Sequence, residues 1–108
     1  VEKAIESTRP GNTCHDVAVA FWSVLEKYGL EKESRCGYSI GLGYPPDWGE
    51  HTLSIRKNEM TLLYPNVTYH LMAGMWMDTW GLEISESIRV TENGCELFCD
   101  FPRNLHLV

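Results

Sequence analysis

The clearest pattern along the chain is an alternation of apolar and polar residues from Gly81 to Thr91. Side chains of a β-strand alternate between two faces, so the pattern predicts a strand that is buried on one side. Glu86 breaks the pattern, because it shares the parity of its apolar neighbours Ile84 and Ile88. A carboxylate directed at a core is costly unless it is paired, hydrogen-bonded or bound to a metal. Glu86 is therefore either a functional carboxylate or a residue that faces a water-filled crevice or a chain edge.

Two helices are predicted before this strand. A short one occupies residues 1–9, and an amphipathic one runs over about residues 14–28, where apolar residues recur at three- and four-residue steps. Thr13 is the expected N-cap of the second helix, and Asp16 three residues later indicates a capping box. Gly29 is its expected C-terminal stop.

The remaining pattern predicts short strands that follow one another along the chain. The expected strands are residues 37–44, which contain three alternating glycines, then 52–55, 60–63, 67–77 and, after the turn Glu92-Asn93-Gly94, 95–99. Residues 31–35 are expected to form a polar loop and residues 45–50 a turn-rich loop. One or two helices followed by sequential antiparallel strands predict an α+β domain.

Composition and charge exclude several classes of function. A length of 108 residues suits one small domain with a single core. The formal charge of −6, without any basic cluster, excludes nucleic acid and anionic membrane surfaces as expected partners. The apolar runs are too short to span a bilayer. Four cysteines without a Cys-x-x-Cys pair predict reduced thiols and a cytoplasmic protein.

Among the titratable residues, His70 is the strongest candidate for chemistry. It lies inside a long predicted strand, whereas the other three histidines lie at a helix start, after a loop and in the tail. The alternative is that His70 is a hydrogen-bonded core histidine. Aromatic residues are a second candidate feature, since they can wall a pocket for a small apolar or cationic ligand or simply belong to the core: Tyr38, Tyr44, Trp48, Trp76 and Trp80.

Four segments in order resemble landmarks of the methionine aminopeptidase, prolidase and creatinase superfamily, which has the pita-bread fold. They are Arg9-Pro10-Gly11-Asn12-Thr13, Gly37-Tyr38-Ser39-Ile40-Gly41, the strand from Pro65 to Gly74 and the segment from Glu83 to Glu96. The resemblance covers nearly the whole chain. It implies that residues 1–108 are a partial catalytic domain, the C-terminal half of a pita-bread fold with one or two helices packed on a curved antiparallel sheet.

The resemblance also has consequences for metal binding. In that superfamily two Asp, one His and two Glu hold two metal ions, and both Asp lie in an earlier half of the domain. Here Tyr38 stands at the His position and Met72 at the first Glu position, so that Glu86 is the only matched ligand. A thioether and a neutral phenol are poor ligands for hard divalent ions. The resemblance therefore implies no metal cofactor, with two ions such as Mn or Co as the alternative.

The loop from Gly43 to Glu50, together with Gly74-Met75-Trp76, looks most like ectoine hydrolases, which open the cyclic amidine ring of a compatible solute. This likeness implies metal-independent hydrolysis of a C–N bond in a small substrate. The implied catalytic residues are Glu86 and His70, and the implied substrate-binding residues are Tyr38, Tyr44, Asp47, Trp48 and Met72.

Two other functions stay open. One is a metallo-aminopeptidase or Xaa-Pro dipeptidase, and the other is a non-catalytic pita-bread domain that binds a peptide or protein. For the chain by itself we expect no activity, because the first half of the domain is missing. We also expect a homodimer formed along an exposed strand edge.

Overall fold

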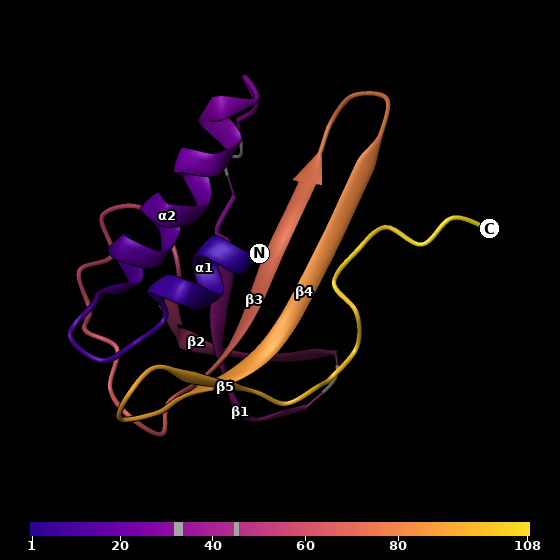
Figure 1. Cartoon of the computed structure of the whole chain (residues 1–108). Helices are drawn as coiled ribbons and strands as arrows, with labels where there is room; N and C mark the ends of the chain where they lie inside the picture. Colours follow the sequence, from indigo (N-terminus) through magenta and orange to yellow (C-terminus); the bar gives the residue numbers. More distant parts are fainter. Residues whose placement is uncertain (32–33, 45) are drawn as a thin grey trace.

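The computed structural model describes residues 1–31, 34–44 and 46–108, and for residues 44 and 47–51 it describes the backbone alone. Two helices lie on one side of a five-stranded antiparallel sheet with the order β2-β1-β3-β4-β5 (Figure 1). The elements are α1 (Glu2–Ser7), α2 (Cys14–Lys27), β1 (Gly37–Tyr44), β2 (Asp47–Ser54), β3 (Thr68–Trp76), β4 (Gly81–Val90) and β5 (Cys95–Leu97). The predicted α+β class is confirmed. Among the described residues, no helix has the length and apolar character needed to cross a membrane.

Helix α2 begins and ends where the sequence predicts. The Thr13 hydroxyl accepts a hydrogen bond from the Asp16 amide, and the Asp16 carboxylate accepts one from the Thr13 amide. These bonds satisfy two amides that would otherwise lack a partner at the helix start. Gly29 has a φ of +67°, the left-handed conformation that commonly follows a helix end.

The core lies between α2 and the two longest strands. Val17, Phe21 and Leu25 face the sheet from α2 and are buried with Tyr69 of β3 and Ile88 of β4, among others. Over residues 68–72 of β3, buried residues alternate with half-buried ones, as expected for a strand covered on one face only. The opposite face of β3 and β4 points away from the helices, and we call it the open face.

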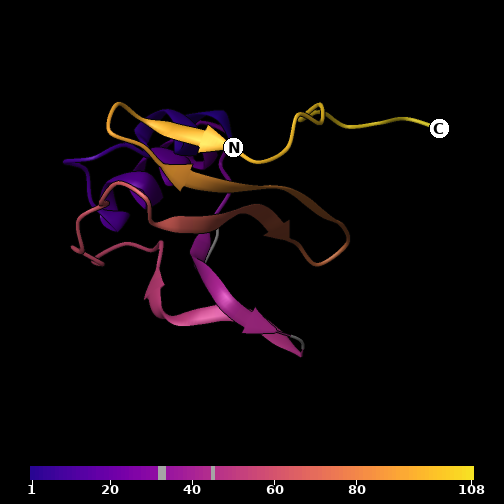
Figure 2. The ribbon, with the colours of Figure 1, turned by 90° about the horizontal axis from the view of Figure 1, so that it is seen from below.

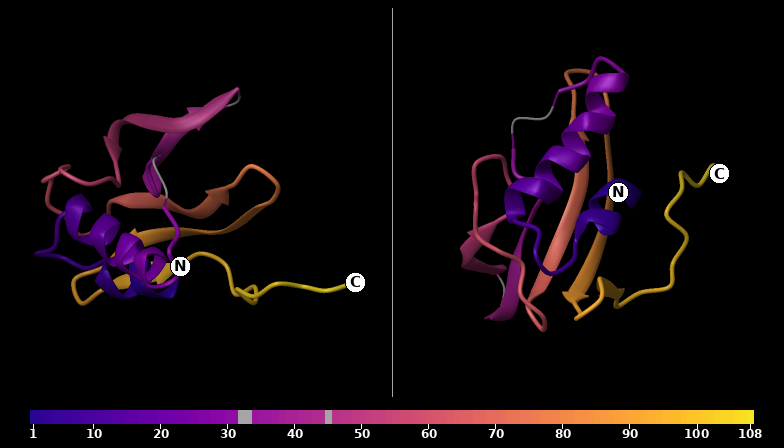
Figure 3. Two further views of the ribbon diagram at one scale, coloured as in Figure 1. Left: turned by 90° about the horizontal axis from the view of Figure 1, so that it is seen from above. Right: turned by 60° about the vertical axis from the view of Figure 1, so that its left-hand side comes forward.

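Hairpin β1–β2 turns away from the rest of the sheet. β1 pairs with β3 only over Gly37–Ser39 and continues with β2 as a ribbon, whose register shifts between Tyr38 and Ile40 and again before Tyr44. Such irregularities bend a strand and increase its twist. In Figure 2 the hairpin lies on the far side of β3 from the helices, and Figure 3 shows the same separation from above. The sheet is therefore curved, as a pita-bread half requires.

Some predicted elements are wrong. Residues 47–50 belong to β2 instead of a loop, because the hairpin pairs Tyr44 with Asp47 directly. Residues 60–63 form one isolated bridge, between Leu62 and Thr13, because this segment bonds to the start of α2 instead of the sheet. β5 ends at Leu97, so Cys99 lies outside it. The turn at residues 92–94 forms without a positive φ at Gly94.

Candidate functional site

The open face brings together polar side chains from three strands. Residues paired across a sheet share a face. His70 pairs with Tyr38 of β1 on one side and with Ser87 of β4 on the other, and Met72 pairs with Ser85. The face away from the helices therefore carries a phenol, an imidazole, a thioether and two hydroxyls in neighbouring positions.

His70 is held by both of its neighbours. Its Nδ1 lies 3.1 Å from the Ser87 Oγ, and its ring centroid lies 5.4 Å from that of Tyr38 with the planes tilted by 45°. Burial lowers the pKa of the His70 imidazole, while the carboxylates of Glu83 and Glu86 act in the opposite direction. The result is an oriented imidazole that is neutral at neutral pH, which is the form that accepts a proton.

Tyr38 is fixed in turn by Arg35, which sequence reasoning missed. The guanidinium carbon of Arg35 lies 4.7 Å from the centre of the Tyr38 ring, and its Nη1 donates to the Ser54 Oγ at 3.2 Å. This places a cation over the ring face, where the negative quadrupole of the ring stabilises it. Nothing in the local sequence signals this contact, because it joins the loop before β1 to the end of β2.

Glu86 does not share the open face with His70. It pairs with Leu71, whose side chain belongs to the helix-covered core, so the carboxylate leaves β4 on the helix side, where it is 5% exposed. There it accepts a hydrogen bond of 3.5 Å from Arg103 in the C-terminal segment, and Arg103 also donates to Glu2 of α1 at 2.7 Å. The predicted inward direction of Glu86 is thus confirmed, and its predicted catalytic role stays a prediction.

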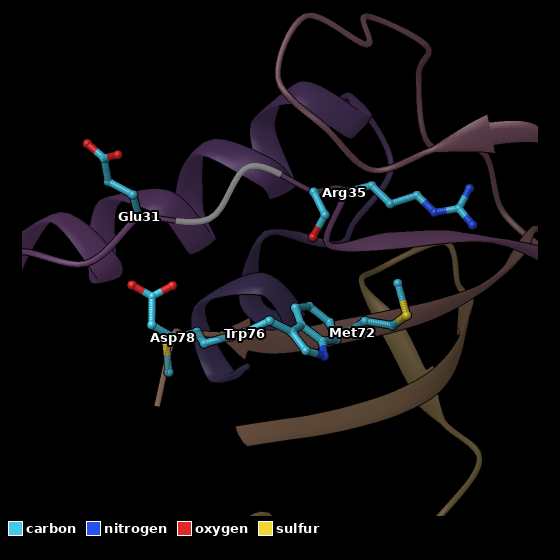
Figure 4. Close-up of a pocket in the computed structure, with 7 residues that line it drawn as sticks. Glu31, Arg35, Met72, Trp76 and Asp78 are labelled. Atoms are coloured by element: carbon cyan, nitrogen blue, oxygen red, sulfur yellow. The ribbon is translucent and has the colours of Figure 1, made fainter. Parts of the chain in front are cut away.

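Two pockets adjoin the open face. One, of about 770 Å³, lies between the loop before β1 and the end of β3 (Figure 4). The other, of about 420 Å³, lies between β4 and the C-terminal segment, and both His70 and Glu86 contribute to its lining. Both residues can line it because β5 covers only residues 88–90 of β4, which leaves a free edge where the two faces meet.

The other predicted site residues are distributed as follows. The side chains of Tyr44, Asp47 and Trp48 lie outside the described residues, so their predicted roles stay predictions. Met72 lines the larger pocket. His15 accepts a hydrogen bond from the Asn58 amide at 2.9 Å and so fastens a turn to α2.

The open face does not fit the two-metal site that is typical of the superfamily the sequence resembles. Its residues at the two ligand positions are Tyr38 and Met72, the residue that faces Met72 is Ser85, and Glu86 points to the other side of the sheet. Within the described parts of the chain, no group of three or more His, Cys, Asp and Glu side chains is placed to hold a metal ion. Hard divalent ions select carboxylate and imidazole over thioether and phenol. Tyr38 and Met72 therefore do not suit hard divalent ions at these two positions of the open face.

Comparisons with known proteins identify the fold and the family of the chain. The ectoine hydrolase of Halomonas elongata is 50% identical over 106 residues, which are 97% of this chain and 27% of that protein. The dipeptidase PepE of Mycobacterium ulcerans superposes with a TM-score of 0.86 at 28% identity, over 96% of this chain and 28% of its own. The prolidase of Pyrococcus horikoshii superposes with a TM-score of 0.85 at 22% identity, over 97% of this chain and 30% of its own.

The chain thus spans about a quarter of the length of the ectoine hydrolase that it matches. The superposed prolidase and dipeptidase show that two helices on a five-stranded antiparallel sheet form part of the pita-bread fold. The family model of metallopeptidase family M24 matches residues 1–92. The chain therefore belongs to metallopeptidase family M24, within the pita-bread superfamily.

Proposed function

We propose that this chain is the C-terminal part of the catalytic domain of a hydrolase that cleaves a C–N bond in a small, ectoine-like substrate. The observation that carries the proposal is the 50% identity to ectoine hydrolase along 97% of the chain. The open face supports it, because its imidazole and hydroxyls can move protons, whereas its thioether and phenol replace expected metal ligands. We refer below to the complete polypeptide that contains these residues as the full-length protein.

In this proposal His70 transfers the proton. Hydrolysis of a C–N bond needs a base that takes a proton from water and an acid that gives one to the leaving nitrogen. When the Nδ1–H of His70 donates to the Ser87 Oγ, which lies 3.1 Å away, Nε2 is left as the acceptor. The same imidazole, once protonated, returns the proton to nitrogen. Tyr38 restrains the ring from its other side.

We assign Glu86 to anchoring instead of proton transfer. Its carboxylate is buried on the helix side and meets Arg103, which also binds Glu2. One guanidinium thus joins β4, α1 and the C-terminal segment. The pairing explains how an acid can lie among apolar residues, since burial of a charge is tolerated when it is paired and hydrogen-bonded.

The Glu86→Gln variant of the full-length protein is expected to loosen the C-terminal segment while changing kcat by less than about twofold. The amide removes one of the two charges that hold Arg103, so the segment around Arg103 detaches more often and trypsin cleaves the peptide bond after Arg103 faster. Timed proteolysis followed by mass spectrometry measures this, and Glu92→Gln in the exposed turn is the matched control. Loss of turnover with unchanged cleavage at Arg103 would instead make Glu86 the catalytic base.

We propose that this activity is metal-independent. A second candidate is a metal-dependent dipeptidase, favoured by the superposition with the dipeptidase PepE at a TM-score of 0.86. The donor set of the open face favours the metal-independent reaction, because it offers one imidazole beside groups that hard divalent ions bind poorly. No step of the proposed reaction passes through a metal.

A substrate comparison tests the proposed function. The full-length protein is incubated with ectoine and, separately, with Xaa-Pro dipeptides, and products are followed by NMR. Ring opening of ectoine without dipeptide cleavage is the expected result. If the dipeptides are cleaved and ectoine is not, the protein is a dipeptidase, the second candidate.

A further inference from the structure

The open face carries one carboxylate of β4, that of Glu83. This residue pairs with Gly74 of β3 and has the parity of Ser87, which is the partner of His70. Side chains alternate along a strand, so Glu83 and Ser87 share a face. Glu86, the other acid of β4, is buried on the helix side. Of the two acids, only Glu83 therefore lies on the face of His70.

Glu83 and His70 line the same pocket. It is the pocket of about 420 Å³ between β4 and the C-terminal segment, and its volume lies within the size range of small-molecule sites. Glu83 is four residues along β4 from the partner of His70, which corresponds to about 13 Å of strand. Because both side chains reach into the pocket from its two ends, a small molecule between them can contact both.

The indole of Trp76 lies on the other side of Glu83. It is folded over Gly74, since a Cβ added to Gly74 would come within 2.9 Å of Trp76 Cζ3. Gly74 is the residue directly opposite Glu83, and such pairs are about 5 Å apart at Cβ. The ring belongs to the lining of the larger pocket. Glu83 thus stands between an aromatic ring and the pocket that it shares with His70.

Glu83 supplies the uncompensated charge of this smaller pocket. The fixed charges in its lining are those of Glu83, Glu86 and Arg103, and Arg103 pairs with Glu86 and with Glu2. No cation pairs with Glu83 in the part of the chain that the structure describes. Burial lowers the pKa of the His70 imidazole, and the strongest opposing influence is the Glu83 carboxylate. A ligand beside His70 therefore meets one available negative charge.

We propose that Glu83 binds the cationic nitrogen of the substrate and so holds the scissile C–N bond beside His70. The inference rests on the proposed function and adds a residue that determines specificity. A protonated amidine presents N–H groups that carry positive charge, and a carboxylate accepts hydrogen bonds from such groups more strongly than from neutral ones. The two residues then have separate tasks, because Glu83 orients the substrate and His70 transfers the proton.

Calorimetric titration of the full-length protein tests the inference through binding. The titration uses a His70→Gln background, in which ectoine is not consumed, at about pH 8, where an ordinary histidine is neutral. The probes are ectoine and the cyclic urea with the same ring and carboxylate, whose nitrogens carry no charge. Glu83→Gln is expected to weaken ectoine binding by about tenfold, as loss of one hydrogen bond to a charged group does, and to leave urea binding unchanged.

Two further variants sharpen the test. Glu83→Asp keeps the charge and should retain part of the affinity that Glu83→Gln loses. Glu92→Gln removes a charge from an exposed turn outside the pocket, so it is the matched control and should bind ectoine like its parent. Equal ectoine affinity in Glu83→Gln and Glu92→Gln would overturn the inference, and so would equal weakening of ectoine and urea, which indicates a purely structural role.

Failure of the inference and failure of the proposed function give different results. Ring opening by the unaltered protein, with ectoine binding that ignores Glu83, contradicts the inference alone. Ectoine binding that depends on Glu83, without ring opening by the unaltered protein, contradicts the proposed function alone. Absence of any ectoine binding would overturn both.

Discussion

Replacing His70 with glutamine in the full-length protein is expected to lower kcat by about 10²- to 10⁴-fold, the usual contribution of a general acid–base residue. Glutamine keeps a similar size and can still bond to Ser87, which lies 3.1 Å from the imidazole, but it cannot carry a proton between water and nitrogen. The rate of ectoine ring opening under saturating substrate measures the effect.

Two controls separate chemistry from structure. His15→Gln alters a histidine that fastens a turn to α2, away from the open face, and should leave kcat unchanged. Ser87→Ala removes the partner that orients the ring and should cause a smaller loss than His70→Gln. If His70→Gln retains most of the turnover in a folded protein, proton transfer belongs to another residue.

The pH dependence of the hydrolysis rate should reflect the titration of a partly buried histidine, His70. Proton abstraction needs the neutral imidazole, so activity is lost as the pH falls through the pKa of His70. Burial lowers that pKa below the ordinary value of 6.5, which moves the acid limb of the kcat/KM profile to lower pH. We therefore expect the acid limb of the wild-type profile to lie at lower pH than the limb of a solvent-exposed histidine would.

Replacing Gly37 with alanine is expected to destabilise the protein by about 2 kcal/mol, within the usual cost of overpacking a core. The added Cβ would lie 2.8 Å from the His70 carbonyl oxygen and 2.9 Å from the Ile55 Cδ1. A backbone carbonyl inside a paired strand cannot move aside cheaply, so β1 must shift away from β3. Because Tyr38 is the next residue, the same shift should loosen its contact with His70.

Chemical denaturation of Gly37→Ala measures the loss of unfolding free energy. Gly94→Ala is the matched control, because a Cβ there meets no atom within 4 Å and Gly94 lacks a positive φ. Equal stability of the two variants would show that β1 and β3 are not packed as closely as described.

The spacing of apolar residues was sufficient to predict the helices and strands that are buried on one side only. Helix α2 and strand β4 have an apolar set at fixed spacing, and both lie where that spacing predicts. β2 was missed at its start because Asp47 and Gly49 are poor strand formers, and pairing with β1 overrides that preference. Residues 60–63 have strand-like composition, but tertiary hydrogen bonds to the start of α2 decide their conformation.

The site was predicted only in part, because it depends on register. Parity along β4 correctly indicated that Glu86 points inward. It could not indicate which residue of β3 lies opposite, since the turn at residues 77–80 sets that pairing. His70 and Ser87 therefore emerge as partners only in the folded sheet. The contacts of Arg35 and Arg103 join segments far apart in the chain, and no local pattern reports them.

Metal-free hydrolysis of the C–N bond can be tested in one experiment. The rate of ectoine ring opening by the full-length protein is determined before and after exhaustive chelation, with metal content quantified by elemental analysis in the same samples. We expect an unchanged rate and a metal content far below one ion per chain. Loss of activity on chelation, restored by Mn²⁺ or Co²⁺, would contradict it.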